Sequence, residues 1–397
     1  MAREYQPRQF FRQVSNGLLR RYFDGKKVLA EVDFTKLTET KIEPVHEAWL
    51  LLADDARNDM ERDFREVHDL ATEGGNKAIL DEAQFHGEDL AGPFSKLNDF
   101  HERAMWALLE RPKYWTGAVY FHRADSVPHS YWRRRKNVPR NPANYDQSSP
   151  AVRLLEKNVS GYFHTMQGRG QNCKVECYRR GGLDYFFAYP EDYARASVEW
   201  AGKNFTRRVH HPAFELIFVF SQVEGTLDVY LAGNRKPVPD LQAIFAQAIL
   251  RAELGPDEKD ELVYELSPLR ARNFQFDYPA ESGITDVSVC RLRLSVHGKK
   301  DRLTLEADPS YNKRAIFDLL DRVTKGIPLA EMAITKVGLK VTFAHTPSAR
   351  RQPTRTFDIS SPNSCSLRHD GRDLIIRKML ADSGIEPREP SPTGKTA

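Results

Sequence analysis

From residue 173 onward the sequence repeats one pattern, in which two strand-like runs flank turn residues. An apolar spacing typical of a helix follows most pairs. The paired runs are 173–180 with 183–189, 214–222 with 226–232, 288–297 with 302–307, and 334–344 with 355–359. The segment 191–200, after the first pair, fits either period. We expect an α+β body of about four hairpin-helix (ββα) units, with an antiparallel sheet and helices on one face.

The rest of the chain differs from this body. Amphipathic helical spacing dominates residues 1–110, which predicts a mostly helical unit. In the segment 111–172, about the first 40 residues contain four prolines. We therefore expect a proline-broken connector with one strand at 115–122. The body then covers residues 173–385, and the Pro-rich, polar segment 386–397 predicts a disordered tail.

Charge is separated along the chain. Residues 31–110 hold 20 acidic and 8 basic residues, whereas residues 111–180 hold 14 basic and 4 acidic residues. The switch falls at Arg111, and the whole protein carries only +4. Net charge alone is therefore uninformative, and the important question is what the basic stretch faces.

The densest basic group lies in the connector and is interleaved with aromatic residues. Consecutive bases can neutralise several phosphates, and aromatic rings offer faces on which nucleotide bases stack. We expect this segment to be a loop, and other bases to join it where the fold brings them near. The predicted nucleic-acid-binding residues are Tyr131, Trp132, Arg133, Arg134, Arg135, Lys136, Arg140, Arg207, Arg208, Lys299 and Lys300.

Three interpretations of this basic loop stay open. It binds an outside polyanion, it docks on the acidic region 31–110, or it is an ordinary solvated loop. The first predicts contacts with phosphates rather than with base edges, and thus an affinity that falls steeply with salt. The second neutralises the acidic region within the chain. A related alternative is a protein scaffold whose basic loop pairs with acidic helical faces between subunits or with a partner.

A nuclease is the alternative that involves catalysis. Asp184 on a predicted strand, followed by Glu199 and Lys203, forms a loose version of an acidic pair with a lysine that holds a divalent metal. The pattern departs from the usual one because Ala201 stands two residues after Glu199. A lone Glu-x-x-His at Glu43 falls short of the two that a di-iron bundle needs.

Composition sets the class of protein. Four cysteines in 397 residues favour a reducing compartment, and no apolar run approaches the roughly 20 residues of a membrane span. We therefore expect a cytoplasmic, prokaryotic, non-enzymatic component of a multi-protein system, with no cofactor, metal or membrane. Its expected partner is nucleic acid or an acidic protein surface, and the acidic helical unit is a further surface for a partner protein or self-association.

Overall fold

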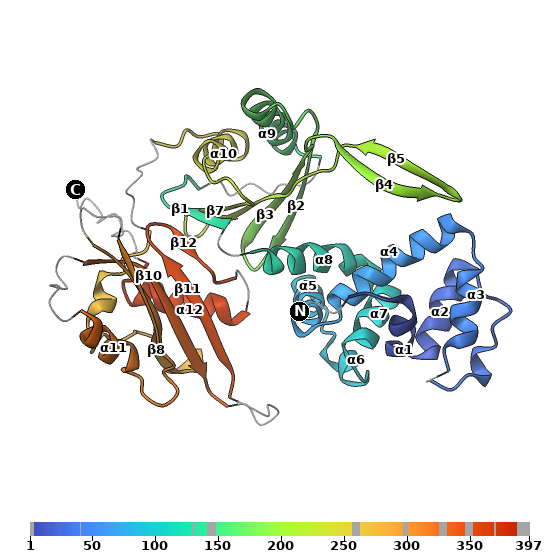
Figure 1. Ribbon diagram of the computed structural model, residues 1–397, viewed down its shortest axis with the longest axis horizontal. Coiled ribbons are helices and arrows are strands. Elements are labelled where there is room, and N and C mark those ends of the chain that lie inside the picture. The colour runs from blue at the N-terminus through green and yellow to red at the C-terminus, as the bar shows by residue number, and fades with distance from the viewer. Residues whose placement is uncertain are drawn as a thin grey trace. The chain divides into compact units, whose positions relative to one another are not determined.

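The computed structural model shows that the chain folds into two compact units (Figure 1). Unit 1 comprises Met1–Val127 and Ala196–His210, and unit 2 comprises Pro128–Arg195 and His211–Ala397. The structure describes residues 4–39, 41–128, 131–140, 148–255, 263–296, 301–324, 332–345, 352–368 and 371–386.

Unit 1 is helical up to Val127. Its helices are α1 (Pro7–Gln13), α2 (Asn16–Lys26), the 3-10 turn η1 (Phe34–Lys36), α3 (Glu43–Leu50), α4 (Asp54–Leu70), α5 (Glu73–Phe85), α6 (Ala91–Ser95), α7 (Phe100–Glu110) and α8 (Pro112–Ser126). Short polar caps start several of them. The Asp99 carboxylate, for example, accepts hydrogen bonds from the backbone N–H groups of His101 and Glu102 at the start of α7. One apolar cluster, centred on Phe10, Phe11 and Phe64, fills the space between the helices.

Helix α8 stands where the sequence predicted a strand at 115–122, so that prediction is wrong. Residues 112–126 are α-helical, and Ala118 and Phe121 are buried. Pro112 occupies the first helical turn, where a backbone N–H has no partner in any case, and Pro128 follows the helix end. Two of the prolines that argued against regular structure therefore mark where a helix begins and ends.

The first sheet of unit 2 has strand order β1-β7-β6-β3-β2. Its strands are β1 (Trp132–Arg135), β2 (Cys173–Arg180), β3 (Leu183–Pro190), β6 (Leu216–Ser221) and β7 (Thr226–Leu231), all antiparallel to their neighbours. Helix α9 (Pro150–Gln167), helix α10 (Val238–Phe245) and the π-helical turn η3 (Ala246–Leu250) pack on this sheet around a core of its own.

The second sheet of unit 2 has strand order β12-β11-β10-β8-β9 and a separate core. Its strands are β8 (Ile284–Val296), β9 (Arg302–Glu306), β10 (Met332–Phe343), β11 (Thr354–Ser360) and β12 (Ser364–Cys365). The 3-10 turns η4 (Ser267–Arg270) and η5 (Ala280–Ser282) precede it, and helices α11 (Ala315–Val323) and α12 (Gly371–Asp382) contribute Ile316 and Ile376 to its core. At the junction of the two sheets, the backbone N–H of Arg134 in β1 donates to the carbonyl of Asn363.

A two-stranded ribbon interrupts this order. Strands β4 (Arg195–Ala201) and β5 (Asn204–His210) pair only with each other among the described strands. The segment after the first predicted hairpin is thus a strand and not a helix. The structure establishes a mixed α+β protein with a helical N-terminal part and antiparallel sheets, while the regular ββα repeat is not confirmed.

Candidate functional site

The basic segment that we predicted as a loop is strand β1. It pairs antiparallel with β7, and Arg134 lies directly opposite Asp228. Because side chains alternate across a strand, the consecutive bases are divided between two faces instead of forming one continuous patch. The prediction of a loop is wrong for Trp132–Arg135, since the backbone of β7 pairs with this segment in the sheet.

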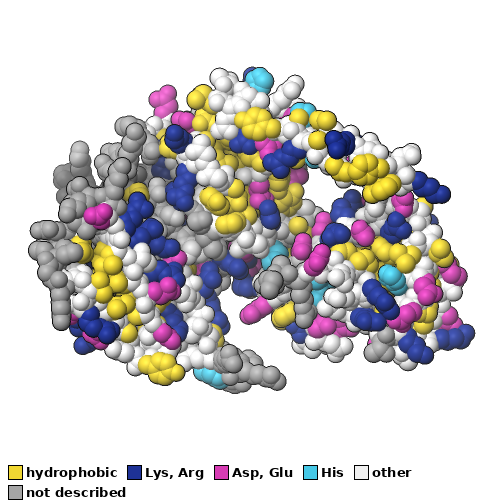
Figure 2. Space-filling view, in the orientation of Figure 1, with side chains coloured by type: hydrophobic (Ala, Val, Ile, Leu, Met, Phe, Trp, Pro, Cys, Tyr) yellow, Lys and Arg dark blue, Asp and Glu magenta, His cyan; other side chains and the backbone are white. Residues whose placement is uncertain are grey.

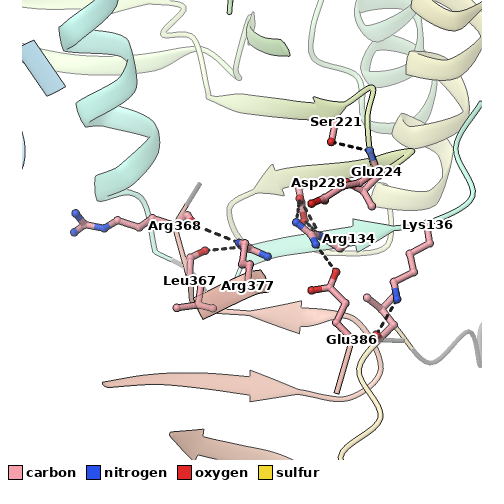
Figure 3. A network of polar contacts seen from close by, with 11 residues as sticks. Arg134, Lys136, Ser221, Glu224, Asp228, Leu367, Arg368, Arg377 and Glu386 are labelled. Carbon is pink, nitrogen blue, oxygen red and sulfur yellow. Dashed lines mark hydrogen bonds and ion pairs between the residues drawn. The ribbon is translucent and has the colours of Figure 1, made fainter. Parts of the chain in front are cut away.

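Arg134 is buried, and its charge is balanced within the protein. Its Nε and Nη2 donate to the Asp228 carboxylate, with Nη2 to Oδ2 at 2.9 Å, and its Nη1 donates to Glu386 (Figure 3). Burial opposes the charge of Arg134, but the two carboxylates raise its pKa well above the usual value. Glu386 belongs to the predicted tail, yet it is buried, whereas residues 387–397 lie outside the described residues. Arg134 therefore ties the first sheet to the segment after α12.

The aromatic residues beside these bases also turn inward. Trp132 is buried, and its ring lies 5.5 Å from that of Tyr230 on β7. The Tyr131 ring lies 6.3 Å from the same Tyr230 ring in an edge arrangement. These aromatic side chains are thus engaged with the sheet in the structure.

Beside Arg134 is a pocket of about 530 Å³, which we call the Arg377 pocket. This volume lies within the roughly 300–1,000 Å³ of most ligand sites. Its charged lining residues are the cations Arg134, Lys136, Arg140, Arg377 and Lys378 and the carboxylates Glu224, Asp228 and Glu386. Five cations face three carboxylates, which leaves an excess of positive charge.

Arg377, on α12, is a buried cation in this pocket whose hydrogen-bonding capacity is only partly satisfied. It is only 9% exposed, and its Nε and Nη2 donate to the carbonyls of Arg368 and Leu367. Its Nη1 is buried without a hydrogen-bond partner among the described residues. Arg134 is near enough to repel it electrostatically, and Figure 3 shows the two guanidinium groups beside each other. A buried N–H without a partner is costly, and an anion at this position would satisfy it.

A second pocket, the Arg293 pocket, lies along the other face of β1. It has a volume of about 390 Å³, and its charged lining residues are Arg133, Arg235, Arg293, Lys336 and Asp358. Asp358 is engaged by Lys336 at 2.8 Å and by Arg291 at 2.7 Å. The Nε of Arg293 is buried without a hydrogen-bond partner among the residues that the structure describes. Positive charge is again in excess.

The other predicted residues of unit 2 have separate positions. Arg140 is exposed and lines the Arg377 pocket. Lys136 lines the same pocket and donates to the carbonyl of Val263 at 3.3 Å, while Arg135 donates to the carbonyl of Gly255 at 2.7 Å. The structure thus brings Arg134, Lys136 and Arg140 to one pocket and places Arg133 at the other.

The remaining predicted residues do not share these pockets. Arg207 and Arg208 are exposed on the ribbon and belong to unit 1. Lys299 and Lys300 lie outside the described residues.

The beginning of the basic stretch pairs with the acidic region. Arg111 and Lys113 both form ion pairs with Glu88, and the Tyr114 hydroxyl donates to the same carboxylate at 2.8 Å. Hydrogen bonds from Tyr114 and Arg111 lower the pKa of Glu88 to about 2. Internal pairing therefore accounts for these two bases, while Arg134 finds its carboxylates elsewhere in the chain.

The residues proposed for a nuclease are engaged separately. Both carboxylate oxygens of Asp184 accept hydrogen bonds, from Arg179 at 2.6 Å and from Gln222 at 2.8 Å. Asp184 belongs to unit 2, whereas Glu199 and Lys203 belong to unit 1. Within the described ranges, no three His, Cys, Asp or Glu side chains gather as metal ligands.

Sequence analysis missed Arg377, Arg293 and Glu386. Arg377 lies in helix α12 and Arg293 in strand β8, where a single base normally faces solvent. Their local sequence carries no sign of burial, because the burial depends on distant segments.

Among the described helices, none is long and apolar enough to cross a membrane. Neither a protein-family model nor a curated protein sequence matches this chain.

Proposed function

We propose that this protein binds nucleic acid, and that unit 2 holds backbone phosphates in the Arg377 and Arg293 pockets. One observation carries the proposal, namely that the Nη1 of Arg377 is buried without a partner in a pocket where five cations face three carboxylates. A phosphate oxygen accepts charge-assisted hydrogen bonds from guanidinium groups and would lower this excess charge. Arg293 supports the proposal, since its Nε is also buried without a hydrogen-bond partner among the described residues, in a second cation-rich pocket.

The mode of binding follows from the residues that are accessible. Arg140 and Lys378 are exposed at the Arg377 pocket, so they supply first contact with a phosphate, and Arg377 lies deeper. Lysine and arginine contacts of this kind fix the backbone and carry no sequence information. We therefore propose that the protein binds without strong sequence preference, as a binding component and not as a catalyst.

The test compares the binding of labelled oligonucleotides at several salt concentrations. The double variant Arg140→Ala, Lys378→Ala removes two exposed pocket cations, so we expect weaker binding and a log–log salt slope smaller by about 2. The matched control is Arg372→Ala. Arg372 is an exposed cation on α12, the helix that also carries Lys378, and its guanidinium lies over the Phe343 ring. Equal affinities and slopes for the double variant and the wild type would refute the proposal.

A further inference from the structure

The ribbon of β4 and β5 has one apolar face and one polar face. Trp200 and Phe205 contact each other with ring centroids 5.3 Å apart, and alternation places Val198 and Val209 on their side. The other face carries Ser197, whose hydroxyl donates to the Arg208 carbonyl at 3.4 Å. Arg208 and Glu199 also face each other there, at 3.8 Å.

The apolar face is open to solvent. The residues Val198, Trp200, Phe205 and Val209 are between 59% and 69% exposed. Figure 2 shows hydrophobic side chains along the ribbon, with Lys or Arg side chains beside them. Single exposed apolar residues are ordinary, but four together on one face form a patch of the kind found at binding sites. A two-stranded ribbon alone is also only marginally stable in water, so contact with a partner would stabilise it. The face is therefore suited to being covered by a partner.

The charge of the ribbon indicates the partner. Residues 196–210 contain Lys203, Arg207 and Arg208 but a single acid, Glu199. Arg207 alternates onto the apolar side, next to the aromatic pair, and Lys203 lies in the turn between the strands. A partner that presents both flat apolar surfaces and negative charge matches this combination. Unpaired bases on a phosphate backbone have both properties.

The turn disfavours a lipid bilayer as the partner. The tip of the ribbon is Gly202-Lys203, and the polar Asn204 follows directly. A hairpin that inserts into a membrane needs apolar residues at its leading end, whereas here Trp200 and Phe205 are set back from it.

We infer that the ribbon binds single-stranded nucleic acid, with Trp200 and Phe205 stacking on unpaired bases and Lys203 and Arg207 contacting phosphates. This inference rests on the proposed nucleic-acid binding and names the form of nucleic acid that the protein recognises. The pockets flanking β1 contact phosphates of any strand, while stacking requires bases released from a duplex.

Trp200 provides a direct spectroscopic test. Of the five tryptophans, Trp49, Trp115 and Trp132 are buried and Trp106 is partly buried, whereas Trp200 is 69% exposed. Titrating the full chain with a dT oligomer is expected to quench tryptophan fluorescence, and Trp200→Phe is expected to abolish most of the quenching while the oligomer still binds. Duplex DNA of equal length is expected to quench much less.

Binding measurements complete the test. The double variant Trp200→Ala, Phe205→Ala is expected to bind the dT oligomer about 10- to 100-fold more weakly, with a smaller change for duplex DNA. The control is Tyr311→Ala, which removes another exposed aromatic ring, 98% exposed, from unit 2. Wild-type affinity of the ribbon variant for the dT oligomer would overturn the inference, as would quenching by anionic phosphatidylserine vesicles and not by the oligomer.

The two proposals fail in different ways. If the pocket variant of Arg140 and Lys378 loses affinity while the ribbon variant does not, the nucleic-acid function stands and the ribbon inference is wrong. If the wild-type chain binds neither single-stranded nor duplex nucleic acid at low salt, the function itself is wrong.

Discussion

Strand β1 and the ribbon are both rich in arginine and aromatic residues, but their side chains have opposite surroundings. In β1, Trp132 is buried and Arg134 is paired with Asp228 and Glu386. In the ribbon, Trp200 and Arg207 are exposed. The two segments have similar composition, so composition alone does not decide whether an arginine reaches an outside partner.

The difference comes from what each strand is paired with. β1 lies at the edge of a five-stranded sheet and receives a carboxylate directly across from Arg134. The ribbon strands have only each other among the described strands, and the side chains of β5 are mostly exposed. Cations in a sheet therefore become structural where they meet a buried carboxylate, as Arg134 does at Asp228, and they stay accessible where the pair lies in solvent, as with Arg208 and Glu199.

The largest expected effect is at Arg134. In Arg134→Met, the carboxylates of Asp228 and Glu386 lose their partner while they stay buried, so we expect a loss of about 3–5 kcal/mol in the free energy of unfolding. Chemical denaturation and the hydrogen exchange of amides in β1 and β7 measure the loss. The control Arg140→Met changes an exposed arginine of the same segment and is expected to alter stability by less than about 0.5 kcal/mol.

A rescue variant checks the cause of this loss. Combining Arg134→Met with Asp228→Leu and Glu386→Leu replaces the whole ionic group by apolar side chains and is expected to recover most of the stability. If Arg134→Met were as stable as the wild type, then Arg134 would not be a structural cation, and the contrast with the ribbon would disappear.

A smaller effect on stability is expected at Asp192, which lies just before the ribbon in the chain. The buried carboxylate of Asp192 accepts hydrogen bonds from Arg169 and Arg195, each at 2.7 Å, and from the backbone N–H of Tyr193. We expect Asp192→Ala to cost about 1–3 kcal/mol and to increase the hydrogen exchange of β4 and β5 amides. Unchanged exchange in both strands would show that the base of the ribbon is held by other contacts.

The same carboxylate gives a pH dependence. Burial opposes the ionisation of Asp192, but hydrogen bonds led by that from Arg169 hold its pKa below the ordinary value of 3.8. Its stabilisation is therefore complete above pH 3.8 and is lost as the pH falls through the lower, folded-state pKa. We expect the difference in exchange between the wild type and Asp192→Ala to shrink in that acidic range.

The sequence predicted the strands better than the site. Strand-like apolar runs indicate β2, β3, β6 and β7 near their observed bounds, because these strands supply residues to the core of a local sheet. The partners of Arg134, in contrast, lie 94 and 252 positions along the chain. A pairing between such distant residues leaves no local pattern, so the sequence alone indicates an accessible loop.

The smallest expected effect on stability is in the ribbon and gives the sharpest contrast with Arg134. The double variant Lys203→Ala, Arg207→Ala removes two exposed cations. We expect the free energy of unfolding to change by less than about 0.5 kcal/mol, because surface substitutions of this kind leave no buried charge unpaired. The log–log salt slope of binding to a dT oligomer should nevertheless fall by about 1.4, because two phosphate contacts are gone and each contributes about 0.7 on a single strand. A clear loss of stability with an unchanged slope would mean that these cations, like Arg134, serve the fold.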